Sequence, residues 1–73
     1  MKTYLMVWFN SEGVKPTKVL DSLTSMGFKP MHGSYDFVYS WPERPDVDET
    51  LALGDKVQQT LKGMKVMFKM ESL

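Results

Sequence analysis

Residues 3–9, TYLMVWF, constrain the fold of this chain more than any other segment. They are aromatic, branched or long and apolar, and they run into the turn residues Asn-Ser-Glu-Gly, which is typical of a β-strand followed by a turn. Side chains alternate across a strand, so both faces of this one are apolar. One face carries Leu5, Val7 and Phe9, and the other carries Tyr4, Met6 and Trp8. Such a strand is usually central in its sheet and covered on both sides.

Two later segments have the pattern of amphipathic helices. In residues 15–26, Pro16 suits a first helical turn, apolar residues recur at helical spacing, and Gly27 is a typical stop. Residues 48–63 are predicted as the second helix, with Asp48 as the N-cap. Both helices are expected to pack one apolar stripe against the sheet.

Three further strands are predicted, at residues 28–32, 35–41 and 64–72. Pro30 cannot donate a ladder hydrogen bond, so its strand is expected at an edge of the sheet or to be irregular. The order is then β-α-β-β-α-β with short connections. We predict an α+β, ferredoxin-like domain over residues 1–73, in which a four-stranded antiparallel sheet carries both helices on one face and the first and third strands are central.

The segment YDFVYSW has an aromatic ring at every second position, so a regular strand would place all four rings on one face. Small and branched residues let helices pack closely, which assigns Leu5, Val7, Val38, Val66 and Phe68 to the helix side. The open face is then predicted to carry seven residues: Tyr4, Met6, Trp8, Tyr35, Phe37, Tyr39 and Trp41. The reverse facing of the third strand is the alternative, and the first strand is apolar on both faces in either case.

The size of this aromatic row argues that something covers it. An aromatic side chain carries roughly 150–250 Å², so four exposed rings would offer on the order of 600–1,000 Å². Monomeric proteins seldom expose a contiguous apolar patch above roughly 300–600 Å². We therefore expect a second copy of the sheet, a ligand or nucleic acid bases on this face.

Composition excludes several classes of function. The chain has no cysteine and one histidine, which removes disulfides, thiolate metal sites and histidine clusters. Nine basic residues balance nine acidic residues, so net charge gives no indication of nucleic acid binding. The N-terminal apolar run of residues 4–9 is too short for a membrane span or a signal peptide. We expect a soluble, cytoplasmic protein with no membrane partner.

Candidate catalytic and metal-binding residues are few. Asp46, Asp48 and Glu49 lie close in sequence, but a polar loop leading into a helix cap explains them better than a metal site. His32 has no triad partners. Asp36 is unusual within an aromatic strand, and we expect it to bond backbone N–H groups of the adjacent turn, with a place in a site as the alternative. We predict no catalytic residue, no metal and no cofactor.

RNA-recognition domains share this topology and also carry aromatics on the two central strands. Their third-strand motif has a basic residue and glycines among the aromatics, whereas YDFVYSW has Asp36 and no glycine. Lys65 and Lys69 could contact phosphates, although a solvated strand face is the commoner explanation. Nucleic acid is therefore an unlikely partner, and it is kept as an alternative.

The sequence Gly33-Ser34-Tyr35-Asp36, followed by an apolar strand, resembles the Gly-x-Tyr-Asp signature of the GYD domain family. The opening MKTYLMVWFNSEG is also similar to the start of that family, and effector-binding domains of Lrp/AsnC-type regulators have a related pattern. The chain departs from this pattern in its short first helix and its WPERP loop. The resemblance implies a dimer joined through the sheet as a dimeric α+β barrel, with a small-molecule pocket at the seam near Gly33, Tyr35 and Asp36. With the neighbouring His32, the candidate pocket residues are His32, Gly33 and Asp36.

Together these patterns favour a non-enzymatic homodimer whose aromatic sheet face is the interface and binds a small apolar or aromatic ligand. The first alternative is a module that binds single-stranded RNA or DNA by stacking bases on the same rings. The second is a small α+β barrel enzyme, for which His32 and Asp36 are the candidate polar groups.

Overall fold

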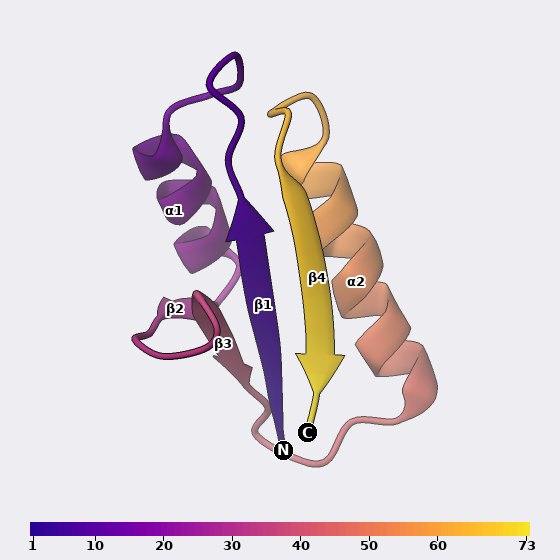
Figure 1. The fold of residues 1–73 in the computed structure, drawn as a ribbon. Helices are drawn as coiled ribbons and strands as arrows, with labels where there is room; N and C mark the ends of the chain where they lie inside the picture. Colours follow the sequence, from indigo (N-terminus) through magenta and orange to yellow (C-terminus); the bar gives the residue numbers. More distant parts are fainter.

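The computed structural model describes residues 1–73 as one sheet with two helices (Figure 1). The four strands are antiparallel and lie in the order β2-β3-β1-β4, with both helices on the same face. This confirms the ferredoxin-like prediction, including the central positions of β1 and β3. The elements are β1 (Lys2–Trp8), α1 (Pro16–Ser25), β2 (Lys29–Pro30), β3 (Phe37–Ser40), α2 (Val47–Leu61) and β4 (Met67–Ser72).

Helix α1 begins at Pro16, whose missing N–H costs nothing in the first turn, and it ends shortly before Gly27. Gly27 has a φ of +106°, a conformation that other residues rarely adopt, and a Cβ there would lie 3.0 Å from the ring of Tyr39. Val19 and Leu23 turn inward from α1 and are fully buried. The predicted helix was therefore correct to within about a residue at each end.

Helix α2 begins at Val47, so its N-cap is Asp46. The prediction of Asp48 as the N-cap was wrong. The Asp46 side chain accepts a hydrogen bond from the backbone N–H of Glu49 at 2.7 Å, and the Glu49 side chain accepts one from the Asp46 N–H at 3.2 Å. This reciprocal capping box satisfies two N–H groups that a helix start leaves free. It also gives Asp46 and Glu49 a structural role at the start of α2.

The hydrophobic core lies between the helices and one face of the sheet. Its side chains come from both helices and from strands β1 and β3, with Phe28 at the entry to β2. The core members are Leu5, Val7, Val19, Leu23, Phe28, Phe37, Leu53, Val57 and Leu61. The burial of Leu5 and Val7 confirms that this side of β1 faces the helices.

The predicted facing of the third strand was wrong. Residues paired across an antiparallel ladder point to the same side, and Phe37 pairs with buried Leu5 while Tyr39 pairs with buried Thr3. Phe37, Tyr39 and Trp41 therefore lie on the helix side, and Val38, paired with Tyr4, lies on the open side. The alternation within β3 was read correctly, but alternation alone does not say which set faces the helices.

Neither helix is long and apolar enough to span a lipid bilayer.

Candidate functional site

The uncovered face of the sheet, called the open face below, is the candidate site. Strand β1 contributes to it the side chains that alternate with the buried Thr3, Leu5 and Val7. Strand β4 contributes the residues paired with them, because Tyr4, Met6 and Trp8 lie opposite Glu71, Lys69 and Met67. With the contributions of β2, β3 and the loop before β3, the open face consists of Lys2, Tyr4, Met6, Trp8, Lys29, Tyr35, Val38, Ser40, Met67, Lys69 and Glu71.

A polar and aromatic cluster occupies one half of the open face. The rings of Tyr4 and Tyr35 are stacked with centroids 4.8 Å apart. The Tyr35 hydroxyl donates a hydrogen bond to Oε2 of Glu71, and Nζ of Lys69 lies 3.0 Å from Oε1 of the same carboxylate. Two strands and the loop before β3 are thus linked at one point, which fixes the orientation of the Tyr35 ring.

These contacts shift the pKa values of Tyr35 and Glu71 in opposite directions. The hydrogen bond to Glu71, with some burial and the nearby negative charge, raises the pKa of Tyr35 above its ordinary 10.0. The hydrogen bonds from Tyr35 and Lys69 lower the pKa of Glu71 below its ordinary 4.5. At neutral pH the pair is therefore a neutral phenol that donates a hydrogen bond to a carboxylate.

The other half of the open face is apolar and exposed. Trp8 is 48 % exposed and Met67, its partner across the β1–β4 ladder, is 73 % exposed. Met6 lies between this end and the tyrosine pair and is partly covered. Large apolar side chains that meet solvent side by side are the strongest indication of a binding surface in this fold.

Asp36 explains why Tyr35 and Phe37 lie on opposite sides of the sheet. Its backbone N–H donates to the carbonyl of Leu5 at 3.0 Å, although Leu5 is paired with Phe37, so two residues face one as in a β-bulge. Its carboxylate Oδ2 accepts the backbone N–H of Val7 at 2.8 Å. The side chain thus replaces a ladder acceptor where β3 leaves β1, rather than bonding the adjacent turn as predicted.

The three remaining rings of the aromatic row have structural contacts on the helix side. The ring of Tyr39 lies 5.4 Å from that of Phe28 and 4.9 Å from that of Trp41. The indole Nε1–H of Trp41 donates to Oγ1 of Thr3 at 2.8 Å, and Thr3 also shares a hydrogen bond of 2.8 Å with Ser72. A buried hydroxyl and a partly buried indole thereby satisfy each other.

The predicted pocket at His32, Gly33 and Asp36 does not correspond to either of the two main hollows of the surface. His32 and Gly33 are exposed in the loop before β3, where Gly33 has a φ of +117°. The structure brings Tyr35, rather than these residues, into contact with the open face. The residues of β4 were missed, although the alternation of Met67, Lys69 and Glu71 with apolar neighbours was visible in the sequence.

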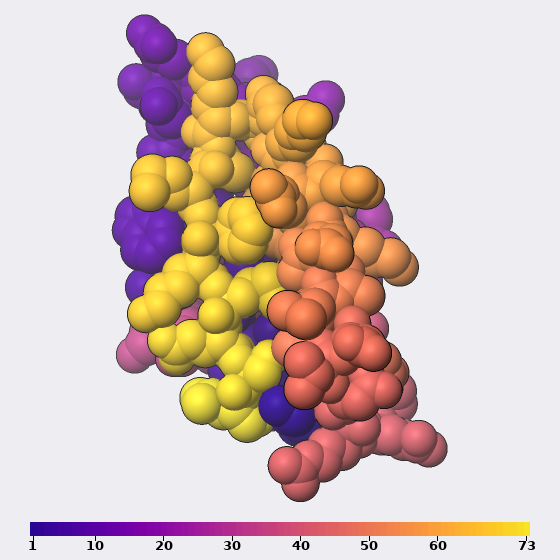
Figure 2. All heavy atoms as spheres, turned by 90° about the vertical axis from the view of Figure 1, so that its right-hand side faces the viewer, coloured from indigo at the N-terminus to yellow at the C-terminus, as the bar shows by residue number.

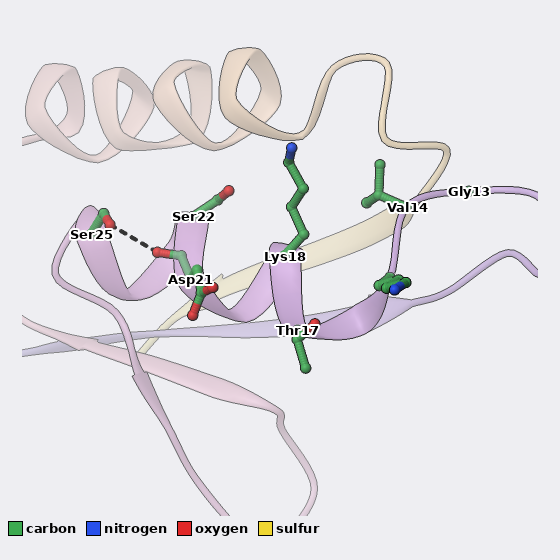
Figure 3. A pocket seen from close by; sticks show the side chains of 8 residues that line it. Gly13, Val14, Thr17, Lys18, Asp21, Ser22 and Ser25 are labelled. Carbon is green, nitrogen blue, oxygen red and sulfur yellow. Dashed lines mark hydrogen bonds between the residues drawn. The ribbon is translucent and has the colours of Figure 1, made fainter.

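One of the two main hollows lies along α1, and Figure 3 shows its side chains. It is a polar depression of about 670 Å³, in which Val14 is the one apolar lining residue and the Ser25 hydroxyl donates to the carbonyl of Asp21 at 2.8 Å. The lining residues are Gly13, Val14, Lys15, Thr17, Lys18, Asp21, Ser22 and Ser25. Most are ordinary exposed residues of a helix surface, and they converge on no reacting group.

Acidic and histidine side chains do not gather into a set of three or more that could hold a metal ion. Scans of protein-family models, curated proteins and solved structures gave no match to this chain. The resemblance to GYD and Lrp/AsnC-type domains therefore stays a prediction. What the open face offers chemically is stacking, apolar contact, one ion pair and the positive charges of Lys2 and Lys29.

Proposed function

We propose that this chain is a non-enzymatic binding domain that forms a homodimer through the open face of its sheet. The observation that carries the proposal is the exposed apolar end of that face, where Trp8 and Met67 meet solvent side by side. Loss of three rings to the helix side makes the surface smaller than the sequence suggested, but β1 alone still supplies Tyr4, Met6 and Trp8.

The energetic reason is the cost of leaving this end in water. A tryptophan carries roughly 250 Å², so the exposed 48 % of Trp8 corresponds to about 120 Å². Covering that area is worth about 3 kcal/mol at roughly 25 cal/mol per Å², before the entropy lost on association. Met67, Met6 and Tyr4 add to this gain, since they form one continuous strip with Trp8 across β1 and β4.

The Lys69–Glu71 pair favours a second copy as the occupant. Lys69 and Glu71 stand two positions apart on the same face of β4, so they form a small pattern of opposite charges. A two-fold axis brings the same patch of both subunits together, which lets the lysine of one copy meet the glutamate of the other. This pairing across the axis offsets part of the positive charge that Lys2 and Lys29 add to the open face.

The test is the molar mass of the chain by light scattering across a dilution series, with Trp8→Glu as the disrupting variant. The original chain is expected to dimerise, and Trp8→Glu is expected to be a folded monomer because a carboxylate would be desolvated at the seam. Leu51→Glu is the matched control, since Leu51 is 62 % exposed on α2, away from the open face. A monomeric original chain, or dimers in all three proteins, would contradict the proposal.

A second candidate is the binding of single-stranded nucleic acid, favoured by the stacked Tyr4–Tyr35 pair and by Trp8 on the same face. Its test is binding to a mixed oligonucleotide pool at low salt. Binding that weakens steeply as salt rises would support it, and no binding at low salt would end it. A small ligand at the rim of the dimer and a cytoplasmic location stay predictions from the sequence.

A further inference from the structure

The two edges of the sheet differ in how well they are protected. Strand β2 forms one edge with two residues, one of which is Pro30, which has no N–H to offer. Strand β4 forms the other edge with six residues, and its one strand partner is β1. A long edge without proline presents a row of backbone donors and acceptors that another extended chain can join.

The register shows which residues point outward from this edge. Lys2 and Leu73 exchange both backbone hydrogen bonds, at 3.2 and 3.0 Å, so they form a hydrogen-bonded pair. Such pairs recur at every second residue of an antiparallel ladder, which makes Glu71, Lys69 and Met67 the residues bonded to β1. The backbone groups of Phe68, Met70 and Ser72 therefore point away from β1, toward the free side.

A groove runs beside the first half of this edge. Helix α2 lies behind the sheet and extends past the outer side of β4 (Figure 1), and Figure 2 shows helix and strand side by side from that direction. The hollow between them has a volume of about 730 Å³, within the usual range of ligand sites. It is lined by Asp55, Gln58, Gln59, Leu61, Lys62, Gly63, Lys65, Val66 and Phe68.

The position of α2 argues against a second copy of β4 as the occupant. Two antiparallel edge strands pair about a two-fold axis perpendicular to the sheet, which keeps the helices of both subunits on the same side. Since α2 extends past β4, the two α2 helices would then compete for the same space. A single extended segment without a helix of its own avoids this conflict.

The lining of the groove indicates the chemistry of that segment. Leu61, Val66 and Phe68 are apolar and suit the alternate side chains of a strand. Lys62 and Lys65 are exposed beside the turn at the far end, and neither forms an ion pair, since the one ion pair of the chain joins Lys69 to Glu71. Because the groove is lined by two lysines and only one carboxylate, that of Asp55, it favours a peptide with a negatively charged end.

We propose that the free edge of β4 binds an extended partner peptide that adds a fifth strand beside it. Alternate side chains of the peptide are apolar and enter the groove under α2. Acidic residues at one end of the peptide lie against Lys62 and Lys65. This surface is distinct from the open face, so the peptide site and the proposed dimer seam can be tested separately.

The first experiment titrates the chain with the peptide Glu-Glu-Val-Thr-Val-Thr-Val-Thr and follows backbone amide signals by NMR. The amides of Phe68 and Met70 are expected to shift and to become protected from hydrogen exchange. Alternate N–H groups of an extended peptide point to opposite edges. Methylating the nitrogens on the edge that faces β4 should abolish binding, whereas methylating those on the other edge should leave binding intact. No binding at about millimolar peptide, or equal effects of the two methylated sets, would overturn the proposal.

The second experiment reverses the charges at the end of the groove. The Lys62→Glu, Lys65→Glu variant should bind the acidic peptide about tenfold more weakly and should prefer a peptide that begins with two lysines. The matched control is Lys15→Glu, Lys18→Glu, which makes the same change in net charge at the start of α1. Equal weakening in both variants would show non-specific attraction and contradict the proposed site. Trp8→Glu should still bind the peptide, even if it abolishes the dimer.

Discussion

The two faces of one strand, β1, show how differently the same sheet treats apolar residues. On the helix side Leu5 is fully buried, and the polar atoms there are paired, as in the bond from Trp41 to Thr3. On the open side Trp8 has a large, mostly apolar side chain and yet is about half exposed. Residue type alone therefore does not mark the core of this domain, and the apolar residues left outside it are the ones available for a partner.

The largest expected difference between the faces is in their contribution to folding stability. Phe37→Ala should lower the free energy of unfolding by about 3–5 kcal/mol, since Phe37 is 6 % exposed and its removal leaves a cavity. Trp8→Ala should cost less than about 2 kcal/mol. Urea unfolding followed by circular dichroism at low protein concentration measures both values. Equal losses would mean that the faces of β3 and β1 are assigned wrongly.

The junction between the faces depends on Asp36. Asp36→Ala leaves the backbone N–H of Val7 without its acceptor, and we expect a loss of about 1–3 kcal/mol of unfolding free energy. Asp36→Asn keeps an oxygen in place and should lose less. The same urea experiment compares them, and an alanine variant as stable as the original chain would show that the carboxylate does not support the ladder.

A smaller effect is expected where an aromatic ring on the helix side has a polar partner. Trp41→Phe removes the donor to Thr3, which keeps its bond to Ser72, and should cost about 0.5–1.5 kcal/mol. Thermal unfolding of Trp41→Phe, of Thr3→Val and of the variant that carries both changes completes a double-mutant cycle. If Trp41→Phe costs the same in the presence and absence of the Thr3 hydroxyl, the hydrogen bond contributes nothing.

The smallest effect concerns protonation on the open face. Tyr35 has a raised pKa, so the stabilisation from its contact with Glu71 is complete below pH 10.0 and is lost as pH rises through the shifted value. Glu71 has a lowered pKa, so its contribution is present above pH 4.5 and is lost as pH falls through its own shifted value.

Ultraviolet titration of the tyrosines should show one that ionises above pH 10.0 in the original chain. In Glu71→Gln the pKa of this tyrosine should return toward 10.0, since the charged acceptor is gone. Tyr35→Phe should remove the late transition altogether. If that transition persists in Tyr35→Phe, another tyrosine carries it and the contact on the open face is not the cause.

The contrast between the faces also shows what the sequence could predict. The order of elements, the central place of β1 and the edge position of the strand with Pro30 follow from local patterns, because they depend on spacing, proline and glycine. The helix-side position of Leu5 and Val7 followed from side-chain shape. The same rule failed for Val38, which lies on the open side opposite Tyr4.

The candidate site was harder to predict because one irregular residue decides it. A regular strand from Tyr35 to Trp41 puts all four rings on one face, and the bulge at Asp36 divides them. The carboxylate of Asp36 is needed because the backbone N–H of Val7 has no other acceptor where β3 leaves β1. That need depends on how the two strands meet, and the local spacing of residues does not encode it. The capping box at Asp46 and Glu49, in contrast, is a local signal and was available in the sequence.

The pairing of β1 with β4 has a consequence for how quickly the domain folds. These strands are the first and last of the chain, and the hydrogen bond between Thr3 and Ser72 spans 69 positions. Long sequence separation between contacting residues slows folding, because an entropic cost of loop closure must be met before the contact stabilises anything. Since the two ends lie side by side (Figure 1), joining them with a short linker and opening the chain in the loop after β3 would turn the most distant contact into a local hairpin. Such a permuted chain should reach the same sheet by a faster route.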